Sequence, residues 1–163
     1  MQSDDLRRTR DILDLQEGTG PVPLLEPADA LAALRSARRI GVVGASNNPW
    51  RPSHGVMRTL LDAGYDCVPI NPNATEVHGI RSWPTLEEAV GATGAVDLIY
   101  VFRRSEHAPD IARSAVAVGA TVLWLQMGVV SWEAAEIAQA GGLGVVMDRC
   151  TAIELRGWRI GDP

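Results

Sequence analysis

The stretch RRIGVVGASNNPWRPSHGV, residues 38–56, decides the fold of this chain. Residues 40–43 form a short apolar run that is typical of a strand buried on both faces. Gly44, Ala45 and Ser46 follow, and their small side chains allow the backbone to turn sharply. A helical spacing of apolar residues begins after Ser53, which we expect to be the N-cap of a helix. A strand, a tight turn and a helix start in this order commonly hold a phosphate group.

Beyond this stretch, apolar strand patterns alternate with helical patterns along the chain. The strands are expected over residues 40–43, 66–71, 80–83, 96–102, 121–126 and 144–147. Strands separated by helices indicate right-handed crossovers and a parallel sheet. The expected strand order is 3-2-1-4-5, with the sixth strand left unplaced. The predicted fold class is α/β: a Rossmann-like, doubly wound, mainly parallel sheet with helices on both faces.

The alternation begins only near residue 38, which predicts two parts of unequal size. Residues 1–37 are expected to form an N-terminal helical appendage, with a charged helix near residues 4–15 and a second helix behind Pro27. Residues 38–163 are expected to form the Rossmann-like domain.

Composition limits the classes of function that remain. The formal net charge of −5 gives no general reason to bind nucleic acid. No apolar run approaches the roughly 20 residues of a membrane span, and the charged first residues do not resemble a signal peptide. We therefore expect a cytoplasmic protein that does not associate with a membrane. Cys67 and Cys150 are too few for a disulfide framework and lack metal-ligand spacing, so no metal site is expected.

All fifteen basic residues are arginines, and lysine is absent. A pyridoxal enzyme needs a lysine to form its Schiff base, and a Walker A loop needs a lysine to reach the β- and γ-phosphates. Both classes are therefore excluded.

In an open α/β sheet, ligands bind beyond the carboxyl ends of the strands. The loops predicted at that edge span residues 44–53, 71–73, 103–106 and 126–130. Ser46 can donate its hydroxyl to a phosphate, and Arg51 can form bidentate phosphate contacts. These four loops are the candidate binding site.

The same edge lacks the features of a dinucleotide site. Gly41 and Gly44 are present, but the third glycine of G-x-G-x-x-G is not, and Asn71-Pro72 stands where an acid would hold the ribose hydroxyls. The missing acid argues against NAD. Asn71 and Pro72 either flank a base or ribose, or form a simple turn.

Four segments carry a family resemblance. They read IGVVGASNNPWRPSHGVMRTLLDAGYDCVPINPN, DLIYVFRRSEHAPDIA, LWLQMGVVS and VVMDRCTAIE, in order between residues 39 and 154. Together they resemble the CoA-binding domain family, whose members are similar to the nucleotide-binding domain of the succinyl-CoA synthetase α subunit. The resemblance implies a Rossmann-like fold that binds coenzyme A.

The resemblance also implies which residues border the coenzyme. The turn after the first strand would approach the phosphates, the second strand's end would border the adenosine, and the later loops would line the groove and face the pantetheine arm. In chain order, the implied cofactor-binding residues are Gly44, Ala45, Ser46, Arg51, Asn71, Pro72, Val101, Phe102, Arg103, Gln126 and Gly128.

No catalytic set is expected. The histidine that is phosphorylated in the synthetase belongs to a second domain outside this resemblance, and none of His54, His78 and His107 matches it. Cys150 either exchanges with the CoA thiol or is a buried structural thiol. Trp50 either covers the ligand or fills a gap.

The leading hypothesis is a protein that binds CoA or an acyl-CoA without catalysis, in a regulatory or carrier-like role. A subunit of an acyl-CoA synthetase-type enzyme that needs a partner chain is one alternative, and an NAD-sensing module is another.

Overall fold

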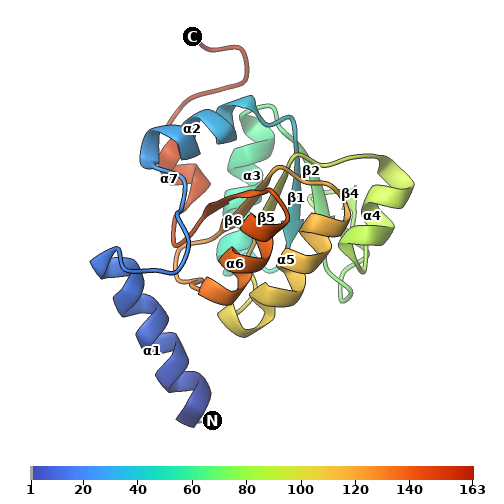
Figure 1. The fold of residues 1–163 in the computed structure, drawn as a ribbon. Helices are drawn as coiled ribbons and strands as arrows, with labels where there is room; N and C mark the ends of the chain where they lie inside the picture. Colours follow the sequence, from blue (N-terminus) through green and yellow to red (C-terminus); the bar gives the residue numbers. More distant parts are fainter. Residues whose placement is uncertain (1) are drawn as a thin grey trace.

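The structure is a computed structural model that describes residues 2–163. Its centre is a five-stranded sheet in the order β2-β1-β5-β6-β7, and every neighbouring pair is parallel (Figure 1). The strands are β1 (Arg39–Val43), β2 (Asp66–Ile70), β5 (Leu98–Val101), β6 (Val122–Leu125) and β7 (Gly144–Val146).

Helices cover both faces of this sheet, as Figure 1 shows. One face packs against α2 (Pro27–Ser36), α3 (Pro52–Asp62) and α7 (Thr151–Leu155). The other face packs against α4 (Leu86–Thr93), α5 (Ala108–Ala117) and α6 (Trp132–Ala140). The predicted Rossmann-like fold class is therefore confirmed.

The strands alternate their side chains between the two helix layers. In β5, Leu98 and Tyr100 point into the α2–α3–α7 layer, whereas Ile99 and Val101 point into the α4–α5–α6 layer. All four are fully buried, as expected of a parallel strand that is covered on both faces.

The predicted strand order is wrong in one respect. Residues 80–83 were expected to form the third strand of the main sheet, but Ile80–Arg81 (β4) pairs antiparallel with Glu76–Val77 (β3) in a separate hairpin. Only Trp83 reaches the main sheet, through a single parallel bridge to Ile70. The nine residues between Ile70 and Ile80 are too few for a crossover connection of a dozen or more residues. The unplaced sixth strand, β7, is the fifth strand of the sheet.

Both edges of the main sheet are partly covered by other segments. At one edge, the Leu25 N–H donates to the Val145 carbonyl of β7 over 2.9 Å. At the other, Trp83 donates to the carbonyl of Pro69 in β2 over 3.0 Å and accepts from Asn71 over 2.9 Å. The chain before β1 therefore covers part of the β7 edge of the sheet.

The two helices of the N-terminal segment pack differently against the main sheet and its helices. Helix α2 buries Ala30 and Leu34 in the core, whereas α1 (Gln2–Glu17) projects away from the sheet (Figure 1). The indole Nε1 of Trp132 donates to the Asp11 carbonyl over 3.1 Å and holds α1 against α6. The division at residue 37 stays a prediction.

Within residues 2–163, no helix combines the length and the apolar composition that crossing a membrane requires.

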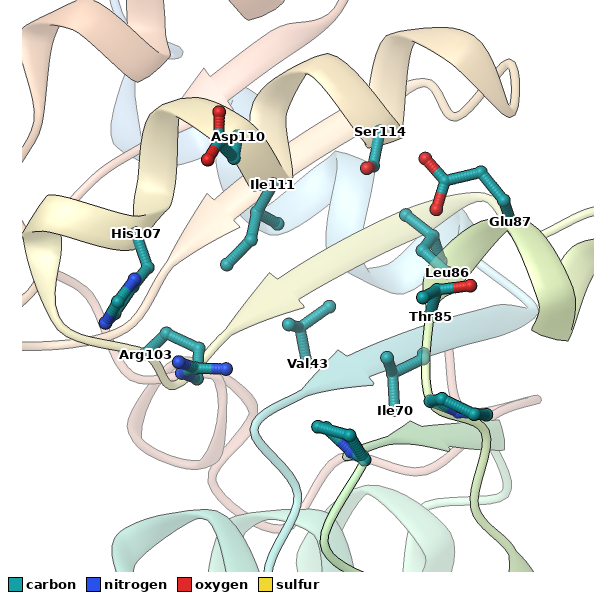
Figure 2. A pocket seen from close by; sticks show the side chains of 12 residues that line it. Val43, Ile70, Thr85, Leu86, Glu87, Arg103, His107, Asp110, Ile111 and Ser114 are labelled. Atoms are coloured by element: carbon teal, nitrogen blue, oxygen red, sulfur yellow. The ribbon is translucent and has the colours of Figure 1, made fainter.

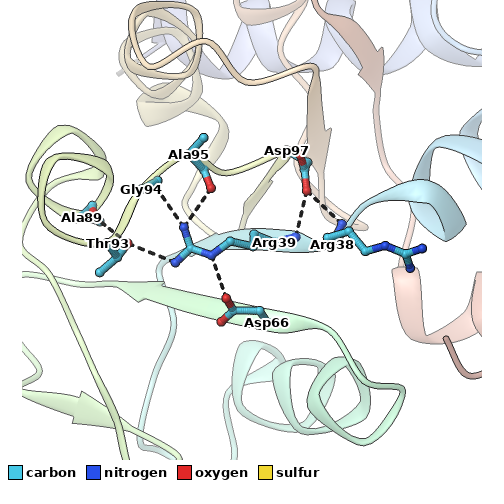
Figure 3. Close-up of polar contacts among 8 residues, drawn as sticks. All are labelled: Arg38, Arg39, Asp66, Ala89, Thr93, Gly94, Ala95 and Asp97. Atoms are coloured by element: carbon cyan, nitrogen blue, oxygen red, sulfur yellow. Dashed lines mark hydrogen bonds and ion pairs between the residues drawn. The ribbon is translucent and has the colours of Figure 1, made fainter.

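At the amino edge of the sheet, a polar network fixes the starts of three strands (Figure 3). The guanidinium of Arg39 contacts Asp66 over 2.7 Å and donates to the carbonyls of Gly94 and Ala95 over 2.9 and 2.8 Å. The Asp97 carboxylate accepts from the backbone N–H groups of Arg38 and Arg39, each over 2.9 Å. The Arg39 side chain and the Arg38 backbone therefore serve the fold, at the edge opposite the carboxyl ends of the strands.

Candidate ligand-binding site

A groove with a volume of about 780 Å³ lies at the carboxyl edge of the sheet. The loops after β1, β2, β5 and β6 all contribute to its walls, as the fold class predicts. Its lining residues are Gly44, Ser46, Arg51, Pro52, Ser53, Asn71, Pro72, Asn73, Phe102, Arg103, Arg104, Gln126, Met127 and Val129.

Gly44 makes the sharp turn at the end of β1. Its φ is +88°, a conformation that side chains other than glycine rarely adopt. A Cβ at this position would lie 3.0 Å from the carbonyl oxygen of Phe102. Glycine is therefore required both for the turn and for the close approach of the loop after β5.

Three hydrogen bonds fix the loop that follows. The Asn71 side chain donates to the Ala45 carbonyl over 2.8 Å, and Nδ1 of His54 lies 2.9 Å from the Ser46 carbonyl, which can only accept. The Ser46 hydroxyl oxygen accepts from the Asn48 N–H over 3.0 Å. The proton of this hydroxyl is therefore available to a ligand.

The N-terminus of α3 faces the same groove, but its cap differs from the predicted one. The N-cap residue is Arg51, without a side-chain capping bond, and Pro52 occupies the first helical turn. Ser53 therefore lies inside the helix, where it is buried and lines the groove. Proline is common at the first position of a helix, so Pro52 could have indicated that the helix begins there. The helix N-terminus adds a partial positive charge to the groove.

Arginine side chains supply the full charges of the groove. Arg51 is exposed and Arg103 is half-buried, and within residues 2–163 neither makes an ion pair with a carboxylate. Arg104 is exposed and lies 3.4 Å from Glu106. The groove therefore favours an anion. Arg104 lies in the predicted loop 103–106 but was not among the predicted binding residues.

The structure brings eight of the eleven predicted residues to this groove, and the other three lie outside its lining. Ala45 and Val101 are fully buried and are not among the lining residues. Gly128 lies between two lining residues, and its N–H donates to the Asp148 carboxylate over 2.6 Å. Six further lining residues lie in the predicted loops but were not among the predicted binding residues: Pro52, Ser53, Asn73, Arg104, Met127 and Val129.

A second recess of about 250 Å³ opens beside the groove, and the two share Pro72 and Arg103 as lining residues. Figure 2 shows Val43 and Ile70 on its strands, with Ile111 and Leu86 reaching in from α5 and α4. Polar side chains surround this apolar floor. They are Thr85, Glu87, His107, Asp110 and Ser114. Apart from Pro72 and Arg103, the sequence did not mark this recess.

The remaining candidates are two histidines, a cysteine and a tryptophan. His54 and His78 pack their rings with centroids 4.2 Å apart, and Nε2 of His78 lies 2.8 Å from the His54 carbonyl. Cys150 is buried. Trp50 is 92% exposed, so it does not fill a gap.

The architecture and the groove define a class: a Rossmann-like α/β protein with an arginine-bearing groove at the switch point of its sheet. A family model described as "CoA binding domain" matches residues 38–156. The chain belongs to this CoA-binding domain family, which confirms the resemblance seen in the sequence.

The chain is also similar to individual proteins and solved structures. The chain is 37% identical over 126 residues to the uncharacterized protein YneT of Bacillus subtilis, and the match covers 77% of this chain and 91% of that protein. A solved structure of a hypothetical protein from Pyrococcus horikoshii is 31% identical, with a TM-score of 0.75 over 80% of this chain and 89% of that one.

A larger enzyme shares the fold. The dinucleotide-forming acetyl-coenzyme A synthetase 1 of Ca. Korarchaeum cryptofilum has a TM-score of 0.60 and 23% identity. The match covers 71% of this chain and 27% of the synthetase. This likeness concerns the fold alone.

Proposed function

We propose that this protein binds coenzyme A or an acyl-CoA at the carboxyl edge of the sheet and does not transform it, in a regulatory or carrier-like role. One observation carries the proposal. In a chain of the CoA-binding domain family, the Gly44–Ser46 turn, the N-terminus of α3 and the guanidinium of Arg51 all border one groove.

The anionic part of the ligand matches the charge of the groove. Coenzyme A carries a pyrophosphate and a ribose 3′-phosphate, and both favour helix N-termini and arginine. We assign the pyrophosphate to the turn, where the Ser46 hydroxyl proton is free. Arg51 and Arg103, which lie on the walls of the groove, then neutralise the negative charge of the phosphates.

The other two parts of coenzyme A fit the regions on either side. The recess beside Pro72 has an apolar floor and a polar rim, which suits a flat adenine ring with polar edges. On the other side, the groove is bordered by Gln126, Met127 and Val129. This wall has no full charge, as suits the uncharged pantetheine arm.

The end of β2 supports coenzyme A over NAD. An NAD site places a carboxylate here to bind the ribose hydroxyls. In this chain the position is Asn71, whose Nδ2 already donates to Ala45 and whose Oδ1 accepts from the Asn73 N–H over 2.8 Å. Both ends of this amide are therefore occupied by the protein.

The contacts of the reactive side chains support binding without chemistry. Nδ1 of His54 is held by the Ser46 carbonyl, and His107 lies at the recess that we assign to adenine, 3.5 Å from Glu106. Among the described residues, neither Ser46 nor Ser53 has a hydrogen bond from its hydroxyl to a histidine or a carboxylate, as an activated nucleophile would.

Calorimetric titration with CoA, acetyl-CoA and NAD tests the proposal. We expect CoA or acetyl-CoA to bind more tightly than NAD, and no turnover of acyl-CoA when ADP and phosphate or ATP is added. NAD binding that is as tight as CoA binding would contradict the choice of ligand. Turnover that is lost in His54→Ala or Cys150→Ala would contradict the absence of catalysis.

A further inference from the structure

The hydroxyl of Tyr100 is buried and contacts both Thr151 and the groove-lining residue Gln126. Tyr100 is in β5 and is fully buried. Its hydroxyl oxygen accepts from the Thr151 N–H over 3.1 Å and contacts Oε1 of the Gln126 side chain. The contact joins residues that are 26 and 51 positions apart in the chain.

The protons in this contact determine which way the Gln126 amide points. A tyrosine hydroxyl has one proton to donate, and burial raises the pKa of Tyr100, so the hydroxyl keeps that proton. The Thr151 N–H donates to the hydroxyl oxygen, and the hydroxyl donates its own proton to Oε1 of Gln126. The amide oxygen therefore faces Tyr100, and the amide nitrogen is left for the groove.

The backbone around Gln126 is held as firmly as its side chain. The Gln126 N–H donates to the Val101 carbonyl over 3.1 Å, and its carbonyl accepts from Val129 over 2.8 Å. The Asp148 carboxylate binds the next turn through the Gly128 N–H, from a backbone with a φ of +59°. The amide nitrogen of Gln126 is therefore fixed before any ligand arrives.

This nitrogen has no acceptor within residues 2–163, and because Gln126 lines the groove, its amide N–H is open to a ligand there. The uncharged arm of CoA carries amide carbonyls, and an acyl-CoA adds a thioester carbonyl. Both offer the acceptor that this position lacks.

We propose that Tyr100 is a positioning residue that turns the amide N–H of Gln126 into the groove, and that Gln126 binds a carbonyl oxygen of the pantetheine arm or of the acyl group. The inference rests on the proposed function and adds the chemistry of one contact.

Three ligands separate this contact from the rest of the site. Adenosine 3′,5′-bisphosphate lacks the arm, CoA has the amide carbonyls, and acetyl-CoA adds the thioester carbonyl. We expect Tyr100→Phe and Gln126→Leu each to weaken CoA binding about fivefold, as loss of one neutral hydrogen bond does. Binding of the bisphosphate is expected to stay unchanged. Weakening of acetyl-CoA alone would assign the contact to the thioester.

A double-mutant cycle tests whether Tyr100 acts through Gln126. The double variant Tyr100→Phe/Gln126→Leu is expected to bind CoA no more weakly than Gln126→Leu alone. Gln126→Glu keeps an oxygen for Tyr100 and replaces the outward donor with an acceptor, so it is expected to weaken CoA at least as much.

Tyr65→Phe is the matched control. The Tyr65 hydroxyl is also buried, and it donates to the Leu34 carbonyl over 2.7 Å, on the side of α2. Its loss is expected to lower the melting temperature and to leave all three affinities unchanged. CoA affinity that is unchanged in Tyr100→Phe and Gln126→Glu would overturn the inference, as would an equal loss of the bisphosphate. A parent chain that binds none of the three ligands would overturn the proposed function itself.

Discussion

The side-chain nitrogen of Asn71 donates to the carbonyl oxygen of Ala45 over 2.8 Å and joins the loop after β2 to the loop after β1. The same side chain accepts from the Asn73 N–H through its oxygen. One amide therefore shapes its own turn and holds the neighbouring turn in place.

Asn71→Asp tests this bridge, because the carboxylate keeps the acceptor for Asn73 and loses the donor for Ala45. We expect the free energy of unfolding to fall by about 1–2 kcal/mol, from one lost hydrogen bond and the repulsion between two oxygens. Urea unfolding measures the change. Asn73→Asp adds the same charge to the groove at a side chain that makes no hydrogen bond among residues 2–163, and an equal loss there would attribute the effect to charge alone.

Arg51→Ala is expected to weaken CoA binding by roughly ten- to a hundred-fold, because an arginine–phosphate contact contributes about 1.5–3 kcal/mol. The melting temperature of the free protein is expected to stay nearly the same, since Arg51 is exposed. Binding of pantetheine, which lacks the phosphates, is expected not to change. Arg58→Ala is the control on the same helix, where the arginine pairs with Asp62 instead. Equal CoA affinity in both variants would show that Arg51 does not touch the phosphates.

Gly44→Ala is expected to destabilise the protein by about 2 kcal/mol or more, since alanine strains a backbone at φ +88° and its Cβ would crowd the Phe102 carbonyl. Gly91→Ala provides the contrast. Gly91 lies inside α4, and a Cβ there meets no atom within 4 Å, so this change is expected to add about 0.5–1 kcal/mol of stability. Thermal unfolding of the two variants compares them directly. A Gly44→Ala variant as stable as the parent would contradict the account of the turn.

Stability is expected to fall at alkaline pH because of the Cys67 thiol. Burial raises its pKa from 9.0 to about 12, and the neighbouring Asp66 charge adds to the effect. The folded state therefore holds the thiol proton more tightly than the unfolded state. This contribution is complete below pH 9 and is lost as pH rises from 9 to 12.

The slope near the middle of that window is about 1.4 kcal/mol per pH unit for this one group. Tyr65, whose pKa burial raises to about 12, adds a similar slope above pH 10. Cys67→Ala is expected to remove the thiol's share, so that its unfolding free energy falls less steeply between pH 9 and 10. Parallel curves for parent and variant would contradict the assignment.

Much of the fold follows from local patterns in the sequence. The strand–helix alternation located all five strands of the main sheet. The Thr-x-x-Glu pattern at residues 85–88 is typical of a helix start, and Thr85 caps α4 by accepting from the Glu88 N–H over 3.2 Å. The pairing of residues 80–83 was not predictable in the same way. An apolar run shows that a strand can form, whereas its partner depends on the length of the connection.

In the candidate site too, features that depend on local sequence were predicted, and features that depend on distant segments were missed. The turn at Gly44 and the loop at Asn71 were found because the fold class places ligands at strand ends. The recess beside Pro72 was missed, since its walls come from α4 and α5, which meet only in the folded chain. The contact between Tyr100 and Gln126 was missed for a related reason: a buried tyrosine in a strand gives no sign of where its hydroxyl points.

Because the Leu25 N–H donates to the Val145 carbonyl, we expect the N-terminal segment to hinder pairing of this sheet edge with another chain. Strand β7 is an edge strand, and an uncovered edge is a template for pairing with another chain. A truncated chain that starts at residue 27 would retain α2 and every strand but would uncover the carbonyl of Val145. We expect this truncated chain to self-associate with increasing concentration, as measured by light scattering, whereas the full chain keeps a constant mass. The segment before α2 would then guard the sheet against aggregation, whatever the groove at the other end of the strands binds.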